Sequence, residues 1–558
     1  MVSTWLVAAT ASAQAPEIAT VPFGESVEVE LVEVEVFVSD TQGKPVTGLT
    51  AADFTLTVDG ARRDIAGFYE AAGLELTQRA ELSTPAIEAR AGEPPSPAAA
   101  AGTATPASAP ERRMSLVVLV DDLHLQPAGR KRTLDRLAVL LGERVAAGDQ
   151  VMIATLDRSL RVRRGFDATT PLAADLAGVY KDAPGGIHSE IDRRHALSII
   201  REFYAGRGCD ALPEMKATAE SWSRQVDNES LLTLTALRSM LGSLAGRSGR
   251  KALLYVTEGM ALNPGLEARF LVDELCPGHP PDPSTGLAAR LHDVTRAANA
   301  AQVTLYTLDA GGQRTLASAV DAGPGLPFAN ESTVRSDAQD PAFVLAADTG
   351  GKALLESNRP ELLVADLAQD LAAYYSLAFT PRPGDAGRAH RIGVEVKRSG
   401  VRVRHRSSWE PQRLEERLGG RLLAALRFGG EDANPLAARL EVGAPHREKD
   451  GSYIVPLRLV VPATGITLIP RGDRRQGRLR ILLAVQDGEG LTTPVREMPL
   501  PVDLAASPAG AADPAQMPLE VRLKLREGRN LIAVAVHDEV GKETSVVRRE
   551  VVVGRAAR

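Results

Sequence analysis

Three stretches of this chain are mostly apolar, without regular alternation, and each leads into a carboxylate. They are residues 114–124, 250–259 and 303–309, with Asp121, Glu258 and Asp309 at or near the strand ends. An apolar run without alternation is typical of a strand that is buried on both faces, as in parallel sheets. Amphipathic helical patterns separate or follow these strands, at 133–145, 229–244, 287–301 and 360–374.

This alternation of strands and helices predicts an α/β domain over residues 113–382, with a doubly wound, mostly parallel sheet. The last helical pattern leads into an apolar strand at 375–379, which we expect to join the same sheet. Residues 181–228 are charged and partly helical, and they interrupt the pattern as an insertion.

Apolar and polar residues alternate on both sides of this domain, which predicts flanking antiparallel β structure. Residues 26–38 alternate with a change of phase near residue 32, which indicates a bulge or a change of strand. Residues 54–58 lead into the hairpin dipeptide Asp59-Gly60. We expect a small N-terminal β-sandwich over 24–75 and, from regularly spaced strands and turns, a C-terminal β-sandwich over 431–558.

Two segments connect these domains. Residues 80–112 are rich in Ala, Pro, Ser and Thr and poor in large apolar side chains, which predicts a linker. Residues 383–430 contain a hairpin pattern and one amphipathic helix, and we expect them to form a connector.

The first residues predict export. A short apolar run in 1–13 ends in Ala11-Ser-Ala13, the small-residue pattern of a signal-peptide cleavage site. The basic start of such a peptide is missing, so the alternative is an Ala-rich N-terminus without a targeting role. We expect a periplasmic or extracellular protein without a transmembrane segment, because no apolar stretch reaches the roughly 18 residues that span a bilayer.

Length and charge narrow the classes of function. A chain of 558 residues is too long for one core, in keeping with several domains. The net charge is −6, the arginines are scattered and aromatic residues make up 4%, so a clustered basic surface for nucleic acid is not expected.

The two cysteines, Cys209 and Cys276, lie in irregular stretches of the predicted α/β domain. In an exported protein a pair of cysteines favours a disulfide. The alternative is two unrelated buried thiols.

The carboxylates at the strand ends are the candidate chemistry. Ligands of α/β sheets bind beyond the carboxyl ends of the strands, and carboxylate oxygens suit hard cations such as Mg²⁺ or Mn²⁺. Asp121, Glu258 and the neighbouring His124 are therefore candidate metal ligands. The alternative is a set of solvated strand ends. A nucleophile elbow and a His-Glu-x-x-His pattern are both missing, which argues against hydrolase chemistry of those kinds.

Several segments in order resemble the von Willebrand factor A-related group of exported proteins, abundant in acidobacteria. The lead-in at 43–54, the strands at 147–154 and 250–259, and the closing segments at 349–353 and 370–377 carry the resemblance. It spans about residues 26–410 and implies a von Willebrand factor A domain.

The resemblance also implies a metal-ion-dependent adhesion site, from which this chain departs. Asp121 matches the first aspartate of that site, but Leu123 and Leu125 stand where two serines are expected. Glu258 replaces a later aspartate, and Ser230 or Thr233 would fill the threonine position. Leucine has no oxygen to offer a metal, so the resemblance implies a degenerate site.

We therefore expect an exported, non-catalytic protein that binds a protein or cell-surface ligand through its A-like domain. The first alternative is Mg²⁺- or Mn²⁺-dependent binding through an altered site. The second is a structural or assembly role of the β-sandwich domains.

Overall fold

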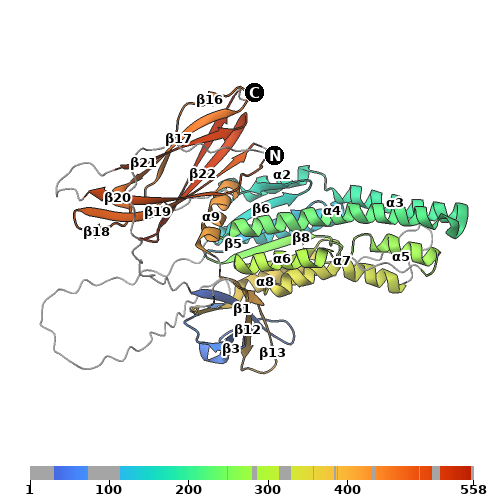
Figure 1. Ribbon diagram of the computed structural model, residues 1–558. Coiled ribbons are helices and arrows are strands. Elements are labelled where there is room, and N and C mark those ends of the chain that lie inside the picture. Colours follow the sequence, from blue (N-terminus) through green and yellow to red (C-terminus); the bar gives the residue numbers. More distant parts are fainter. Residues whose placement is uncertain are drawn as a thin grey trace.

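The computed structural model describes residues 31–72, 113–166, 168–247, 249–278, 286–312, 328–355, 357–382, 385, 388–411, 413–428, 434–488, 490–505 and 516–554. Within them the protein is mixed α/β, with one mixed sheet between helices and antiparallel sheets on two sides of it (Figure 1). The signal peptide expected at 1–13 and the linker expected at 80–112 lie outside the described residues.

The central sheet consists of the three predicted apolar strands and three neighbours. Its strands are β5 (Ser115–Asp121), β6 (Gln150–Leu156), β7 (Leu160–Arg164), β8 (Lys251–Thr257), β9 (Val303–Asp309) and β10 (Ala353–Leu354). Their spatial order is β10-β9-β8-β5-β6-β7, and only the β6–β7 pairing among them is antiparallel. The strand order therefore reverses direction between β5 and β8.

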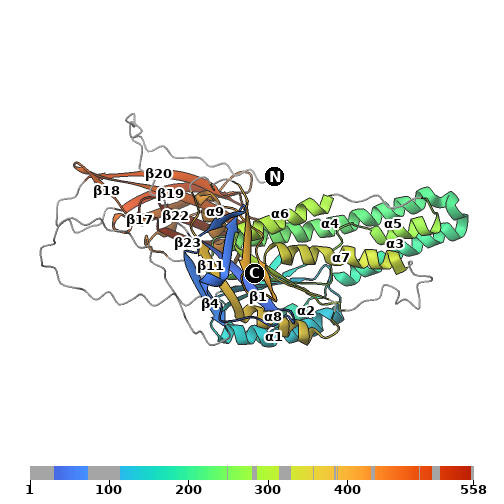
Figure 2. The same ribbon diagram turned by 90° about the horizontal axis from the view of Figure 1, so that it is seen from below.

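Helices cover both faces of the central sheet (Figure 2). One face packs against α1 (Pro127–Ala146), α2 (Leu172–Lys181) and α8 (Pro360–Ala372). The other packs against α4 (Leu212–Leu244), α6 (Gly286–Ala300) and α7 (Phe328–Asp348). Every residue of β5, β8 and β9 is buried, as expected for strands covered on both faces.

The N-terminal β unit consists of two antiparallel sheets that share one apolar cluster. One sheet has the order β13-β1-β11-β4, from β1 (Val32–Asp40), β4 (Gly67–Ala72), β11 (Ala373–Phe379) and β13 (Val401–His405). The other has the order β14-β12-β2-β3, from β2 (Phe54–Val58), β3 (Ala61–Arg63), β12 (His390–Val396) and β14 (Ser408–Trp409). The short 3₁₀-helix η1 (Ala51–Asp53) precedes β2.

This pairing corrects two sequence-based expectations. The strand expected at 375–379 of the parallel sheet lies instead between β1 and β4, antiparallel to both. The N-terminal strands therefore do not form a separate domain over 24–75, because strands from 373–409 complete both of their sheets. Alternation of apolar residues gave the strands correctly, but alternation carries no information about a partner some 300 residues away.

The C-terminal β unit also consists of two antiparallel sheets around a shared apolar cluster. One contains β15 (Arg439–Val442), β16 (His446–Arg447), β17 (Tyr453–Pro462) and β21 (Gln516–Leu525). The other contains β18 (Ile469–Arg471), β19 (Arg474–Asp487), β20 (Arg496–Ala505), β22 (Gly528–Asp538) and β23 (Thr544–Val553), and η3 (Ala463–Gly465) follows β17. Within the described residues β15 pairs only with β17 and β23 only with β22, so both are edge strands.

Helix α9 (Leu414–Phe428) joins the C-terminal β unit to the helical layer. Its leucines pack on β19, β22 and β23 in a separate apolar cluster. Its other side approaches the end of α4 so closely that a Cβ on Gly246 would lie 2.4 Å from the backbone nitrogen of Arg421. The absence of a side chain on Gly246 lets the backbone of this segment pack closely against Arg421.

The insertion predicted at 181–228 forms, together with α5 (Leu266–Leu275), a helical projection that we call the arm. It comprises α3 (Gly186–Arg207), η2 (Gly208–Ala211), the N-terminal half of α4 and α5, and it extends beyond the central sheet (Figure 1). None of the described helices has the length and apolar character needed to cross a membrane.

Candidate functional site at the carboxyl edge of the central sheet

The candidate residues gather where the strand order of the central sheet reverses. Asp121 is the last residue of β5, and Thr257 is the last residue of the neighbouring β8, with Glu258 directly after it. The connections of β5 and β8 leave on opposite faces, so a crevice opens between their carboxyl ends in sheets of this order. The candidate residues predicted from the sequence therefore lie at the edge of the sheet where ligands of such sheets bind.

The Asp121 carboxylate is fully buried and engaged with its neighbours. Its Oδ2 accepts a hydrogen bond from the Tyr255 hydroxyl and lies 2.7 Å from His124 Nδ1. The Thr257 hydroxyl donates to the same oxygen at 3.5 Å. One oxygen of the expected first metal ligand is therefore occupied by protein groups.

His124 pairs closely with Asp121. Burial lowers the pKa of His124, but the Asp121 carboxylate and its hydrogen bond outweigh burial and raise the pKa above its ordinary value. Burial and the same carboxylate also raise the pKa of Tyr255 well above its usual value, so Tyr255 remains a hydroxyl donor. The structure thus brings His124 and Asp121 together, and the carboxylate favours the protonated form of the imidazole.

Glu258 and Asp309 make different contacts. Glu258 Oε1 accepts a hydrogen bond from the Gln126 backbone N–H at 3.1 Å, at the start of α1. Asp309 Oδ1 accepts from the Gly311 backbone N–H at 2.8 Å. Within the described residues, no three His, Cys, Asp or Glu side chains are grouped so that they could share a metal ion.

The two leucines in the serine positions point to apolar surroundings. Leu125 is fully buried in the cluster under α1, and Leu123 packs against the cluster on the opposite face. Asp122, between them in the chain, forms a buried ion pair with Arg130, with Nε and Oδ1 2.7 Å apart. Burial raises the pKa of Asp122 to about 6, against the opposing effect of Arg130.

Three buried oxygen atoms near this end of the domain have no hydrogen-bond partner among the described residues. They are Asp121 Oδ1, Ser230 Oγ and Thr233 Oγ1, and all three side chains belong to fully buried residues. A buried polar atom without a partner costs about 1–3 kcal/mol, so a bound water or ion is the usual explanation for such atoms.

The arm begins at this same edge. A Cβ on Gly186, the first residue of α3, would lie 2.4 Å from the Leu125 backbone oxygen, so α3 starts in contact with the loop after β5. Farther out, α3, α4 and α5 share an apolar cluster of their own, which includes Ile200, Trp222 and Leu271. The arm therefore has a core that is separate from the two cores of the central sheet.

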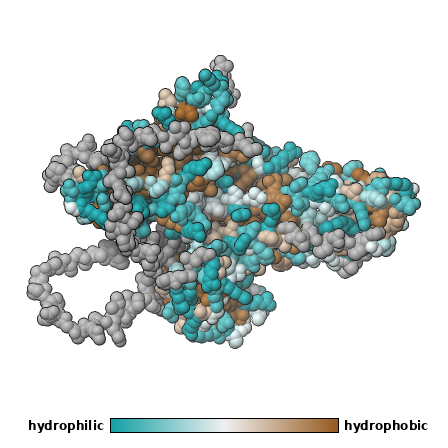
Figure 3. Space-filling view, viewed as in Figure 1, coloured by the Kyte–Doolittle hydropathy of each residue, from teal (hydrophilic) through white to brown (hydrophobic). Residues whose placement is uncertain are grey.

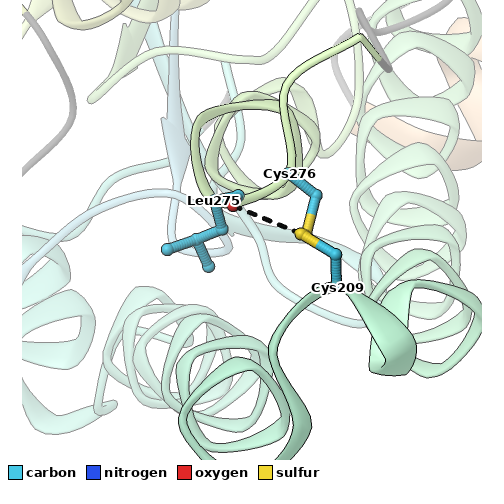
Figure 4. Close-up of a disulfide and its surroundings, with 3 residues drawn as sticks. All are labelled: Cys209, Leu275 and Cys276. Atoms are coloured by element: carbon cyan, nitrogen blue, oxygen red, sulfur yellow. Dashed lines mark hydrogen bonds between the residues drawn. A yellow bond between two sulfur atoms is a disulfide. The ribbon is translucent and has the colours of Figure 1, made fainter.

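A disulfide and polar contacts hold the arm together. Cys209 in η2 and Cys276 after α5 are bonded, with an S–S distance of 2.06 Å, and Cys209 Sγ lies 3.6 Å from the Leu275 backbone oxygen (Figure 4). Arg193 of α3 pairs with Glu267 of α5 at 2.7 Å.

Part of the arm surface is apolar. Ile187 and Ile191, one turn apart on α3, are 36% and 57% exposed. The space-filling view shows apolar surface among hydrophilic surface along the arm (Figure 3). Ile187 and Ile191 therefore form an exposed apolar pair on α3, near the start of the arm.

Sequence reasoning missed three residues that shape the site. Tyr255 lies inside an apolar run, and the pattern predicts only that it is buried. The signal that could have found it is its hydroxyl, because a buried tyrosine hydroxyl needs a hydrogen-bond partner. Gln126 contributes its backbone, which no sequence pattern reveals. Gly129 matters because a Cβ there would lie 2.3 Å from Glu258 Oε1.

No family model and no curated protein matches this chain. Among solved structures, a structural genomics target named SoR45 is 13% identical and covers 21% of this chain and 85% of its own, with a TM-score of 0.14. A β-glucuronidase of Bacteroides uniformis is 9% identical over 32% of this chain, which spans 19% of that enzyme, with a TM-score of 0.15. Such low TM-scores do not indicate a shared fold.

Proposed function

We propose that this chain is an exported, non-catalytic binding protein of the von Willebrand factor A-related type. In this proposal the central sheet and its helices are a doubly wound A domain, and the two β units are β-sandwiches that flank it. The partner is a protein or a cell-surface ligand, and it contacts the carboxyl edge of the central sheet and the arm.

The strand order supports the assignment of the domain type. Numbered along the chain, the strands of the central sheet lie in the order 6-5-4-1-2-3, with only the third antiparallel to its neighbour. This is the order of doubly wound sheets that bind ligands where the order reverses. The disulfide supports export, because disulfides persist outside the reducing cytosol.

The observation that carries the function is the arm. It starts at the loop after β5, has its own apolar core and disulfide, and exposes Ile187 and Ile191 near its base. The disulfide holds the arm in one conformation at the carboxyl edge of the sheet. A surface that is ordered before binding loses less conformational entropy when a partner binds. The Asp121 carboxylate is meanwhile held by Tyr255 and His124, so this mode of binding requires no cation.

The test is capture of surface proteins of the source cells by the full chain, followed by their identification. We compare the wild type with the double variant Ile187→Glu, Ile191→Glu, in buffer with EDTA and in buffer with Mg²⁺. The matched control is Leu362→Glu on α8, an exposed apolar position (50% exposed) away from the arm. The proposal expects one partner that binds in EDTA and is lost only in the arm variant.

A partner that binds equally well to all three proteins would contradict the proposal. Loss of binding in the Leu362→Glu control alone would move the contact to the opposite helical layer.

A second candidate is metal-dependent binding, which the three unpartnered oxygens favour. Asp121 Oδ1, Ser230 Oγ and Thr233 Oγ1 are the kinds of oxygen that Mg²⁺ and Mn²⁺ prefer. In this version His124 would give up its contact with Asp121 to the cation.

Calorimetric titration of Mg²⁺ and Mn²⁺ into the full chain separates the two candidates. The metal version expects binding in the wild type that is lost in Asp121→Ala and weakened in Thr233→Val. No heat in any of the three proteins would eliminate it, because binding of a divalent ion to this site could not then support a partner.

A further inference from the structure

The C-terminal β unit has a groove where the edges of its two sheets meet. Strand β15 of one sheet and β23 of the other line it, together with Leu531 of β22, and its volume is about 550 Å³. Both strands are edges within the described residues, so each has a row of backbone N–H and C=O groups that no strand in those residues pairs with. The groove therefore offers backbone hydrogen bonds as well as side chains.

Arg549 occupies an unusual position on β23. Val547, Val551 and Val553 are on the same face of the strand and belong to the apolar cluster between the sheets. Arg549 has the same phase, yet it is exposed and lines the groove. Arg549 thus occupies a position on the core-facing side of β23, where the alternation of the strand predicts an apolar side chain.

The charges around the groove do not balance. Arg439, Arg548 and Arg549 line it, with Glu441 and Glu550. Both glutamates are engaged by arginines outside the groove, Glu441 by Arg458 at 3.8 Å and Glu550 by Arg529 at 2.8 Å.

Two of the arginines in the groove are not neutralised by a carboxylate of the described residues. Arg439 and Arg549 have no ion-pair partner among the residues that the structure describes. The groove therefore keeps an excess of positive charge.

We propose that this groove binds an extended, acidic polypeptide segment of a partner protein, which adds as a strand to the free edge of β23. Backbone hydrogen bonds along the edge supply affinity for any extended chain. Specificity comes from a carboxylate of the bound segment that accepts two hydrogen bonds from the Arg549 guanidinium. Apolar side chains of the segment, on the same face, pack over Val547 and Val551. The segment recognised has alternating acidic and apolar residues. This surface is distinct from the arm and from the carboxyl edge of the central sheet.

The test uses fluorescence anisotropy with labelled synthetic hexapeptides and the full chain. One peptide repeats Glu-Val three times, and the other repeats Lys-Val. We expect the wild type to bind the Glu-Val peptide and to prefer it over the Lys-Val peptide. Replacement Arg549→Ser should weaken binding about tenfold, the usual effect of losing one charge-assisted hydrogen bond.

Charge reversal provides a result that a folding defect cannot imitate. In Arg549→Glu the preference should switch to the Lys-Val peptide. Arg496→Ser is the matched control, because Arg496 is an exposed arginine on β20, which is also an edge strand in the described residues. It should leave the binding of both peptides unchanged.

Three outcomes would overturn the proposal. They are equal binding of the two peptides by the wild type, no binding of either, and unchanged Glu-Val binding by Arg549→Ser. If Arg549→Ser keeps its Glu-Val binding and also forms dimers in sedimentation experiments, the role of Arg549 is only to prevent the edge of β23 from pairing with a second copy of the chain.

Discussion

At the scale of single residues, Gly129 sets how closely α1 approaches the candidate site. A Cβ at this position would lie 2.3 Å from Glu258 Oε1 and 2.5 Å from the Ala310 backbone oxygen. The backbone oxygen cannot move aside as a side chain can. We therefore expect Gly129→Ala to destabilise the protein by about 1–3 kcal/mol and to lower its melting temperature.

Gly142 on the same helix is the matched control, since a Cβ there would meet nothing within 4 Å. Gly142→Ala should raise stability by about 0.5–1 kcal/mol through helix propensity alone. Equal melting temperatures for the two variants would show that α1 can shift without cost.

His537 predicts an acid-sensitive contribution to stability. Its side chain is buried, with Nδ1 2.9 Å from the Thr544 hydroxyl oxygen and Nε2 without a partner in the described part of the chain. Burial, with a smaller effect of Lys542, lowers the pKa of His537 below its ordinary value. The unfolded chain then binds a proton more readily than the folded chain, so this contribution is lost as the pH falls below about 6.5.

The measurement compares melting temperatures of the wild type and His537→Gln between pH 8 and pH 5. Glutamine does not titrate, so the variant lacks the loss that His537 causes, and the difference between the two melting temperatures should shrink toward acid pH. A constant difference would show that His537 titrates alike in both states.

Sequence patterns found some residues of the site and missed others for a physical reason. Asp121, His124 and Glu258 follow apolar strands, and strand ends are visible in a sequence. Tyr255 and the close approach of Gly129 depend on which neighbours the fold brings near. Those contacts are tertiary and leave no local trace.

At the scale of elements, the disulfide between Cys209 and Cys276 should stabilise the arm more than the rest of the protein. It joins residues 67 apart in sequence and ties the segment after α3 to the end of α5, across a loop that contains α4, β8 and α5. Removing a bond that closes such a loop typically costs about 2–4 kcal/mol. The double variant Cys209→Ser, Cys276→Ser should exchange amide hydrogens faster in α3 and α5, with little change in β19 and β22.

Thiol labelling checks the bond itself. Protein isolated under oxidising conditions should label at neither cysteine before reduction and at both afterwards. Labelling of two thiols in the unreduced protein would refute the bond.

The elements were predictable to different degrees. Residues 303–309 and 54–58 coincide with β9 and β2, because an apolar run and a strict alternation have only one good reading. The helix predicted at 229–244 is the C-terminal half of α4, and its N-terminal half lies in the segment expected as an insertion at 181–228.

At the scale of the whole molecule, the contact between α4 and α9 should determine how the C-terminal β unit is held. A Cβ on Gly246 would lie 2.2 Å from Arg421 Cγ and 2.4 Å from the Arg421 backbone. Gly246→Ala should therefore push α9 away and weaken the coupling between the two parts. Calorimetry should show unfolding split into two transitions that overlap more in the wild type.

Gly242→Ala is the control on the neighbouring turn, because its Cβ would meet nothing within 4 Å. A single unchanged transition in Gly246→Ala would mean that α9 is not the link between the two parts.

The arrangement of the whole molecule was the least accessible from sequence. The patterns gave mixed α/β structure and the β-rich ends. The assembly of the N-terminal β unit from 32–72 and 373–409 depends on strand pairing across the intervening helices, and pairing is decided by the complete core rather than by either segment.

The shared sheets of the N-terminal β unit have a consequence for synthesis. Strand β4 ends at Ala72, and its partner β11 begins at Ala373, about 300 residues later. At roughly 5–20 residues per second, a ribosome needs about 15–60 s to make that stretch. During this interval β1 and β4 have no partner strand, and their apolar edges are open to wrong pairing. We therefore expect the nascent chain to need a holding chaperone most during this interval, while the edges of β1 and β4 are unpaired.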